Sequence, residues 1–151
     1  MRCALGRGGI VGEKREGDGA TPAGNFPLRV VFYRADRLPA PEAGLPVKSI
    51  WETDGWCDDP ESADYNRLVD LPHPARHEFL WRDDGLYDLV VVIGYNDDPP
   101  IPGRGSAIFL HLAKPDLAPT EGCVALARED LLALLKACDA GTRLIVSPPA
   151  G

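Results

Sequence analysis

The chain has 151 residues and a mass of 16.3 kDa, a size that fits one domain in which about 70% of the unfolded surface becomes buried. With 16 lysines and arginines against 23 aspartates and glutamates, the formal net charge of -7 excludes the overall basic field of a non-specific nucleic-acid binder. No apolar run approaches the roughly 20 residues of a membrane span, and the opening residues lack the apolar region of a secretory signal.

Short runs of β-forming residues dominate the chain, and clusters of Pro, Gly and Asp bound each run. The predicted strands are 28–33, 47–51, 86–94, 107–112 and 142–147. Segment 128–138 alone has the apolar period of a helix, with Glu129 and Asp130 in its first turn and Gly141 just after its end. The pattern predicts a mainly β sandwich or barrel with one clear helix.

No linker or internal repeat divides the chain, so we expect a single domain over residues 1–151. The chain opens abruptly on a strand-like segment, which leaves open whether a leading strand is missing. His73 and His77 have the i and i+4 spacing that can bind a metal on a helix, but they lack a nearby Glu pattern or third ligand. We therefore expect a short solvated helix there, and neither a metal nor another cofactor.

The four cysteines contain no CxxC pattern of a zinc or thioredoxin site. Cys138 falls on the apolar stripe of the predicted helix and is expected to be buried. Spacing alone leaves a pairing of Cys3 with Cys57 open. Cys123 must stay free if it is to react.

Cys123 and His111 are the most informative residues. Cys123 lies in the run 120–126, and twelve positions before it His111 ends the apolar run 106–110. A thiol on a turn, with an imidazole at the end of a neighbouring strand, supplies the nucleophile and the base of covalent acyl transfer. Gly122 lets backbone N–H groups approach a reacting carbonyl and form an oxyanion hole.

These residues carry a resemblance to a known family. The turn-rich segment 14–26 and the segment 105–126 together resemble the L,D-transpeptidase catalytic domain, or YkuD domain, of bacterial peptidoglycan metabolism. Segments 55–59, 65–67 and 94–96 resemble connecting segments of that family. The resemblance therefore covers nearly the whole chain and implies a YkuD-like β-sandwich or barrel with one helix after the catalytic cysteine.

The family signature is His, a gap, Ser or Thr, a residue that is usually His, then Gly, Cys, an apolar residue and Arg or Asn. Three departures occur here. The gap between His111 and Thr120 holds only eight residues, Glu121 replaces the second His, and Ala125 replaces the Arg or Asn. The catalytic pair is kept, and the departures fall on positions that contact substrate.

The resemblance implies a periplasmic monomer that acts on peptidoglycan stem peptides and reacts with carbapenems, although no signal peptide is visible in the chain. Cys123 would attack a donor carbonyl, and the backbone N–H groups of Gly122, Cys123 and Glu121 would hold the oxyanion. A backbone carbonyl would orient the ring of His111. The acyl group would pass to an amine of a second stem, giving a 3-3 cross-link, or a 1-3 cross-link from an L-Ala donor.

Stem peptides carry carboxylates, which Arg binds through paired hydrogen bonds that Ala125 cannot make. The expected substrate-binding residues are Thr120, Arg104, Arg128 and Tyr65. Lys114, in the shortened gap, is a further candidate for the missing cation.

Two other functions stay open at this point. The same pair of residues would make a carboxypeptidase, an endopeptidase or an amidase if water reached the acyl-enzyme before an amine did. A non-catalytic wall-binding module is the second alternative, because a fold does not by itself imply a function.

Overall fold

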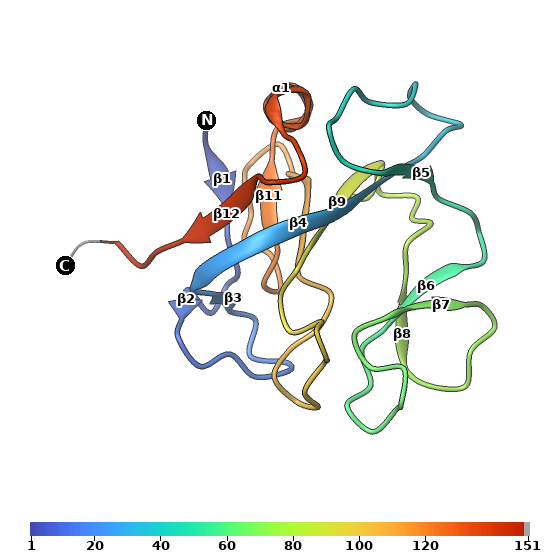
Figure 1. Cartoon of the computed structure of the whole chain (residues 1–151), viewed down its shortest axis with the longest axis vertical. Helices are drawn as coiled ribbons and strands as arrows, with labels where there is room; N and C mark the ends of the chain where they lie inside the picture. Colours follow the sequence, from blue (N-terminus) through green and yellow to red (C-terminus); the bar gives the residue numbers. More distant parts are fainter. Residues whose placement is uncertain (150–151) are drawn as a thin grey trace.

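The computed structural model describes residues 1–149. Its centre is a curled sheet of seven strands (Figure 1). Across the sheet the order is β1 (Cys3–Ala4), β11 (Val124–Leu126), β10 (Phe109–Leu112), β9 (Leu89–Ile93), β4 (Gly24–Tyr33) and β12 (Arg143–Val146), and β5 (Val47–Ser49) also pairs with β4. β10 and β11 run parallel, as do β4 and β5, and the other pairs are antiparallel. Strands far apart in the sequence are therefore neighbours here.

Two smaller sheets flank the central one. One pairs β2 (Ile10–Val11) with β3 (Thr21–Pro22), and the other has the order β7 (Leu68–Asp70), β6 (Asp54–Cys57), β8 (His77–Phe79). The second of these lies at the lower right of Figure 1. It contributes Trp56 and, just after β8, Leu80 to a buried cluster on the face of the central sheet that carries Cys123.

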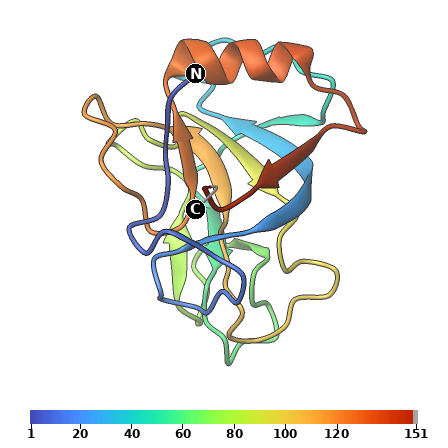
Figure 2. The same ribbon diagram turned by 90° about the vertical axis from the view of Figure 1, so that its left-hand side faces the viewer.

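Helix α1 (Arg128–Ala137) covers the opposite face of the central sheet and crosses the top of the molecule in Figure 2. It buries Leu131 and Leu135 completely, against the side chains of strands that include β10 and β11. Burial of one such leucine contributes about 1.5–3 kcal/mol. In β10, Leu110 and Leu112 face this core, whereas Phe109 packs on the other face. Because side chains alternate between the two faces along each strand, one face of the central sheet is apolar beneath α1 and the other face carries the reactive groups.

The expected mainly β fold with one helix is confirmed. Each predicted strand overlaps an observed one, although β4 begins four residues before the predicted strand 28–33. The observed helix ends one residue before the predicted end, with Cys138 buried as its C-cap. The helix expected around His73 is wrong. Pro72 and Pro74 interrupt that segment, His73 Nε2 lies 2.9 Å from Asp64 Oδ2, and His77 belongs to β8.

All four cysteines are free, so the pairing of Cys3 with Cys57 is not formed; Cys3 is exposed and the other three are buried.

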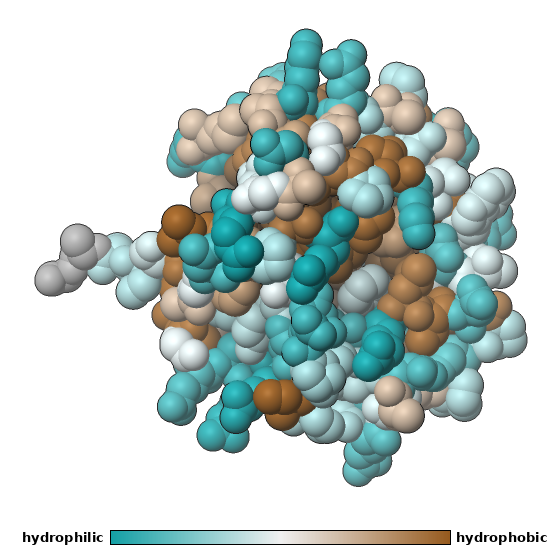
Figure 3. Space-filling model, viewed as in Figure 1, coloured by the Kyte–Doolittle hydropathy of each residue, from teal (hydrophilic) through white to brown (hydrophobic). Residues whose placement is uncertain are grey.

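The surface in Figure 3 is mostly hydrophilic in its lower half, and apolar side chains show mainly in the upper half, between α1 and β5. Among residues 1–149, no helix has the length and apolar character needed to cross a membrane.

Candidate active site

Cys123 lies at the end of a tight turn that leads into β11. Gly122, just before it, has a φ of 135°, and a Cβ at that position would come within 2.8 Å of Ala20 O. The hydroxyl of Thr21 donates a hydrogen bond to Gly122 O at 2.9 Å. Segment 14–26 therefore backs the turn directly, which explains why a glycine is required before the cysteine.

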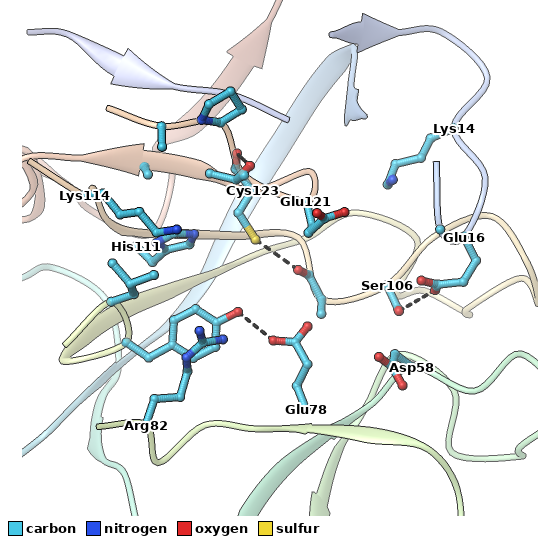
Figure 4. A pocket seen from close by; sticks show the side chains of 18 residues that line it. Lys14, Glu16, Asp58, Glu78, Arg82, Ser106, His111, Lys114, Glu121 and Cys123 are labelled. Atoms are coloured by element: carbon cyan, nitrogen blue, oxygen red, sulfur yellow. Dashed lines mark hydrogen bonds between the residues drawn. The ribbon is translucent and has the colours of Figure 1, made fainter. Parts of the chain in front are cut away.

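Strand pairing brings the imidazole to the same face as the thiol. β10 and β11 are parallel, with His111 paired to Ala125 and Leu110 paired to Val124. Because side chains alternate along a strand, Cys123 and Ala125 share the face of His111, and Leu110 and Val124 point into the core beneath α1. Cys123 and His111 both line a cavity of about 490 Å³. The sequence prediction that they meet is consistent with this arrangement (Figure 4).

The ring of His111 is held in one orientation. Its Nδ1 lies 2.9 Å from Leu112 O, so the proton sits on Nδ1, and Nε2 of the neutral ring is left as a proton acceptor. The Tyr87 ring packs edge-on against it, with centroids 5.4 Å apart. Burial lowers the pKa of His111 below its usual value of 6.5. The ring is thus a neutral base at neutral pH.

Cys123 is buried, with only 7% of the residue exposed. Its Sγ donates to Ala107 O at 3.2 Å and accepts from Phe109 N at 3.4 Å. Burial, with the nearby charge of Glu78, raises the pKa of Cys123 to about 12. The resting pair is therefore a neutral thiol and a neutral imidazole, so a nucleophilic thiolate would require a base to take the proton of Cys123.

A neutral, buried thiol predicts slow alkylation of Cys123 in the resting protein. At pH 7 we expect iodoacetamide to modify Cys123 at least about tenfold more slowly than the exposed Cys3, because the thiolate is the reactive form. The Cys123 rate should keep rising with pH beyond 9. Peptide mass spectrometry after timed quenching gives both rates. Fast labelling of Cys123 with a plateau near neutral pH would show a thiolate–imidazolium pair instead.

The turn also orients backbone N–H groups. Gly122 N donates to Thr120 Oγ1 at 3.1 Å, and that hydroxyl donates to Cys123 O at 2.7 Å. Thr120 therefore lines the cavity as a brace of the turn. Among residues 1–149 no hydrogen bond occupies the N–H groups of Glu121 and Cys123. Within the described residues these two N–H groups are unengaged, whereas Gly122 N already donates to Thr120 Oγ1.

Glu121 stands at the rim of the cavity, with its carboxylate turned to the N-terminal segment. The Arg7 guanidinium is 3.0 Å from it, and both side chains are exposed. The backbones of the same two segments are also hydrogen-bonded, because Arg7 N donates to Thr120 O at 2.8 Å. The residue that replaces the usual second His thus joins the motif to the start of the chain.

Three of the residues predicted to bind substrate do not reach this cavity. Arg104 is exposed on the loop before β10, and Arg128 lies 3.5 Å from Asp88 and lines a different cavity. Tyr65 is buried, and its hydroxyl donates to Glu16 Oε1 at 2.7 Å and accepts from Gly105 N at 2.9 Å. The register of the strand pairs and the direction of the loops determine where these three side chains lie, and neither can be read from the sequence.

The cavity has a cationic and an acidic side, with Cys123 between them (Figure 4). Arg82 and Lys114 lie beside His111, and the acidic group lies across the cavity. That group contains Glu78, Asp58 and Glu16. Lys14, the third cation lining the cavity within residues 1–149, is 2.7 Å from Asp18. Sequence reasoning named Lys114 but missed Arg82, Lys14 and Glu78, since no local pattern marks them.

Comparison with known protein families matches residues 1–146 to YkuD, the L,D-transpeptidase catalytic domain. No curated protein and no solved structure matches the chain significantly. The match spans the sheet, the helix and both residues of the Cys–His pair. The chain therefore belongs to the YkuD family of L,D-transpeptidase catalytic domains.

Proposed function

We propose that the protein is a peptidoglycan L,D-transpeptidase that cross-links stem peptides through an acyl-enzyme on Cys123. The observation that carries the proposal is the placement of Cys123 and His111 on one face of β10 and β11, open to one cavity, with the ring of His111 fixed by Leu112 O. Its substrate would place the protein on the periplasmic side of the inner membrane.

The first half of the reaction loads the enzyme. His111 Nε2 takes the proton of Cys123 as Sγ attacks the donor carbonyl, and the N–H groups of Glu121 and Cys123 stabilise the oxyanion. The protonated imidazole then gives its proton to the leaving amine. For this step Sγ must exchange its hydrogen bond to Ala107 O for one to His111.

The donor carboxylate needs a cation in this cavity, because position 125 carries none. Arg82 and Lys114 lie on the His111 side, so we assign the carboxylate to them in place of Arg104 and Arg128. The Arg82 guanidinium lies 4.7 Å from the centre of the Tyr87 ring and binds Asp84, which holds it in position. A charge-assisted hydrogen bond of this kind contributes roughly 1.5–3 kcal/mol.

Product analysis tests the proposal. Peptidoglycan rich in tetrapeptide stems is incubated with the protein and digested with a muramidase, and the fragments are identified by mass spectrometry. We expect dimers joined through two diaminopimelate residues, or through L-Ala and diaminopimelate if the donor is the 1-3 type. Shortened monomers without dimers would establish the hydrolase alternative, and an unchanged profile would establish a non-catalytic module. Either result contradicts the proposal.

A further inference from the structure

Glu78 occupies an unusual position for a carboxylate. It lies in β8, on the small sheet that closes the cavity, and in Figure 4 its side chain points toward Cys123 from the opposite wall. Its Oε1 accepts a hydrogen bond of 2.6 Å from the Tyr87 hydroxyl. No lysine or arginine forms an ion pair with it among the described residues 1–149. A carboxylate that faces a nucleophile without a cation is costly to keep in a partly dry cavity.

Tyr87 links this carboxylate to the catalytic base. The Tyr87 side chain is buried, its ring meets His111 at 5.4 Å, and it also meets Phe109 at 5.8 Å. Its hydroxyl therefore cannot move away from Glu78 without disturbing the packing around His111. The second carboxylate oxygen of Glu78 stays available to the cavity.

We propose that Glu78 is a second catalytic base, which removes a proton from the incoming acceptor ammonium before the amine attacks the acyl-enzyme. The inference rests on the proposed transpeptidase function, because it needs an acyl group on Cys123 and an amine acceptor. It goes beyond the Cys–His pair, which has only one proton acceptor.

Counting protons shows why one base is not sufficient. An amine arrives at neutral pH as an ammonium ion with three protons, and the amide product keeps one. Glu78 takes the first proton and leaves a neutral amine whose lone pair attacks the thioester carbonyl. As the C–N bond forms and the C–S bond breaks, His111 accepts the second proton and passes it to the departing sulfur of Cys123. The free thiol returns, and Glu78 releases its proton to solvent through the cavity.

Burial raises the pKa of Glu78 above its usual value, and the negative charges of Asp58 and Glu16 act in the same direction. The Tyr87 hydrogen bond and the charge of Arg82 oppose that shift. A base accepts protons most efficiently when its pKa lies close to the working pH. The environment of Glu78 therefore favours proton transfer more than an exposed glutamate would.

The test separates an acceptor that must lose an extra proton from one that need not. The Glu78→Gln variant keeps an oxygen for the Tyr87 hydroxyl and removes the base. Wild type and variant are supplied with a disaccharide-tetrapeptide as donor, and with either a second stem or hydroxylamine, which is uncharged at neutral pH, as acceptor. We expect stem cross-linking by the variant to fall by roughly 100-fold, the usual contribution of a general base. Hydroxamate formation and meropenem acylation of Cys123 should not fall below the wild-type rate, because loss of the Glu78 charge lowers the pKa of Cys123.

Glu61→Gln is the charge-matched control, because Glu61 is exposed and does not line the cavity. It should cross-link like the wild type. Undiminished cross-linking by Glu78→Gln would overturn the inference, and so would an equal loss with stem, hydroxylamine and meropenem, since that pattern means a structural role. A wild-type protein that forms no acyl-enzyme at all would instead refute the transpeptidase function itself.

Discussion

Replacing Cys123 with alanine should abolish cross-linking. Among the described residues that line the cavity, Cys123 alone carries a sulfur, and removal of a nucleophile costs a covalent enzyme a factor on the order of 10⁶ in turnover. The fold should persist, because the lost packing and the weak hydrogen bonds of Sγ contribute only about 1 kcal/mol. Muropeptide analysis gives the activity, and thermal unfolding followed by circular dichroism gives the stability.

Cys138→Ala is the matched control for that experiment. Cys138 is also a buried free thiol, but it caps α1 on the other face of the sheet. The Cys138→Ala variant should be somewhat less stable than the wild type and should keep its cross-linking activity. If Cys123→Ala retained cross-linking, or if Cys138→Ala lost it while folded, the nucleophile would be elsewhere.

Replacing His111 with glutamine should have the second largest effect. A glutamine amide is polar and of similar size but cannot accept the thiol proton, and general-base catalysis contributes about 10²–10⁴-fold. Because the pKa of Cys123 is raised to about 12, little thiolate forms unaided. We therefore expect the meropenem acylation rate of His111→Gln to fall by about 10³-fold, as measured by intact-protein mass spectrometry.

The same base sets the acid side of the pH profile. Neutral His111 is the active form, and burial lowers its pKa, so the neutral form persists below pH 6.5. As the pH is lowered, the rate of wild-type acylation should therefore fall to half its maximum at a pH below 6.5. A midpoint above that value would mean that a negative charge stabilises the protonated ring, in disagreement with the burial described here.

The placement of Cys123 and His111 on one face could be predicted from the sequence because the pattern that indicates it is local. Cys123 follows a glycine turn, and His111 ends an apolar strand only twelve residues earlier, so parallel pairing of two short strands brings them together. The helix was predictable for a similar reason, since its apolar period and its charged first turn extend over 10 residues. Strands such as β1, β2 and β3 have 2 residues each and show no alternation to detect.

The opposite wall of the cavity could not be predicted in this way. Glu78 and Tyr87 come from segments more than twenty residues before His111, and only tertiary packing brings them to Cys123. Arg104 and Arg128 are near the motif in sequence, yet the loop before β10 and the first turn of α1 carry them away from the cavity. Proximity in sequence thus indicated that His111 and Cys123 share one cavity, whereas Arg104 and Arg128 do not line that cavity.

The central claim is an acyl-enzyme on Cys123, and mapping that adduct tests it most directly. The protein is mixed with a disaccharide-tetrapeptide donor without acceptor, quenched in acid and digested, and its peptides are sequenced by mass spectrometry. The account predicts one acyl group per chain, equal to the donor minus its terminal D-alanine, or shorter for an L-Ala donor, on the peptide that contains Cys123. An adduct on Cys3, Cys57 or Cys138, or no adduct with any donor or with meropenem, would contradict it.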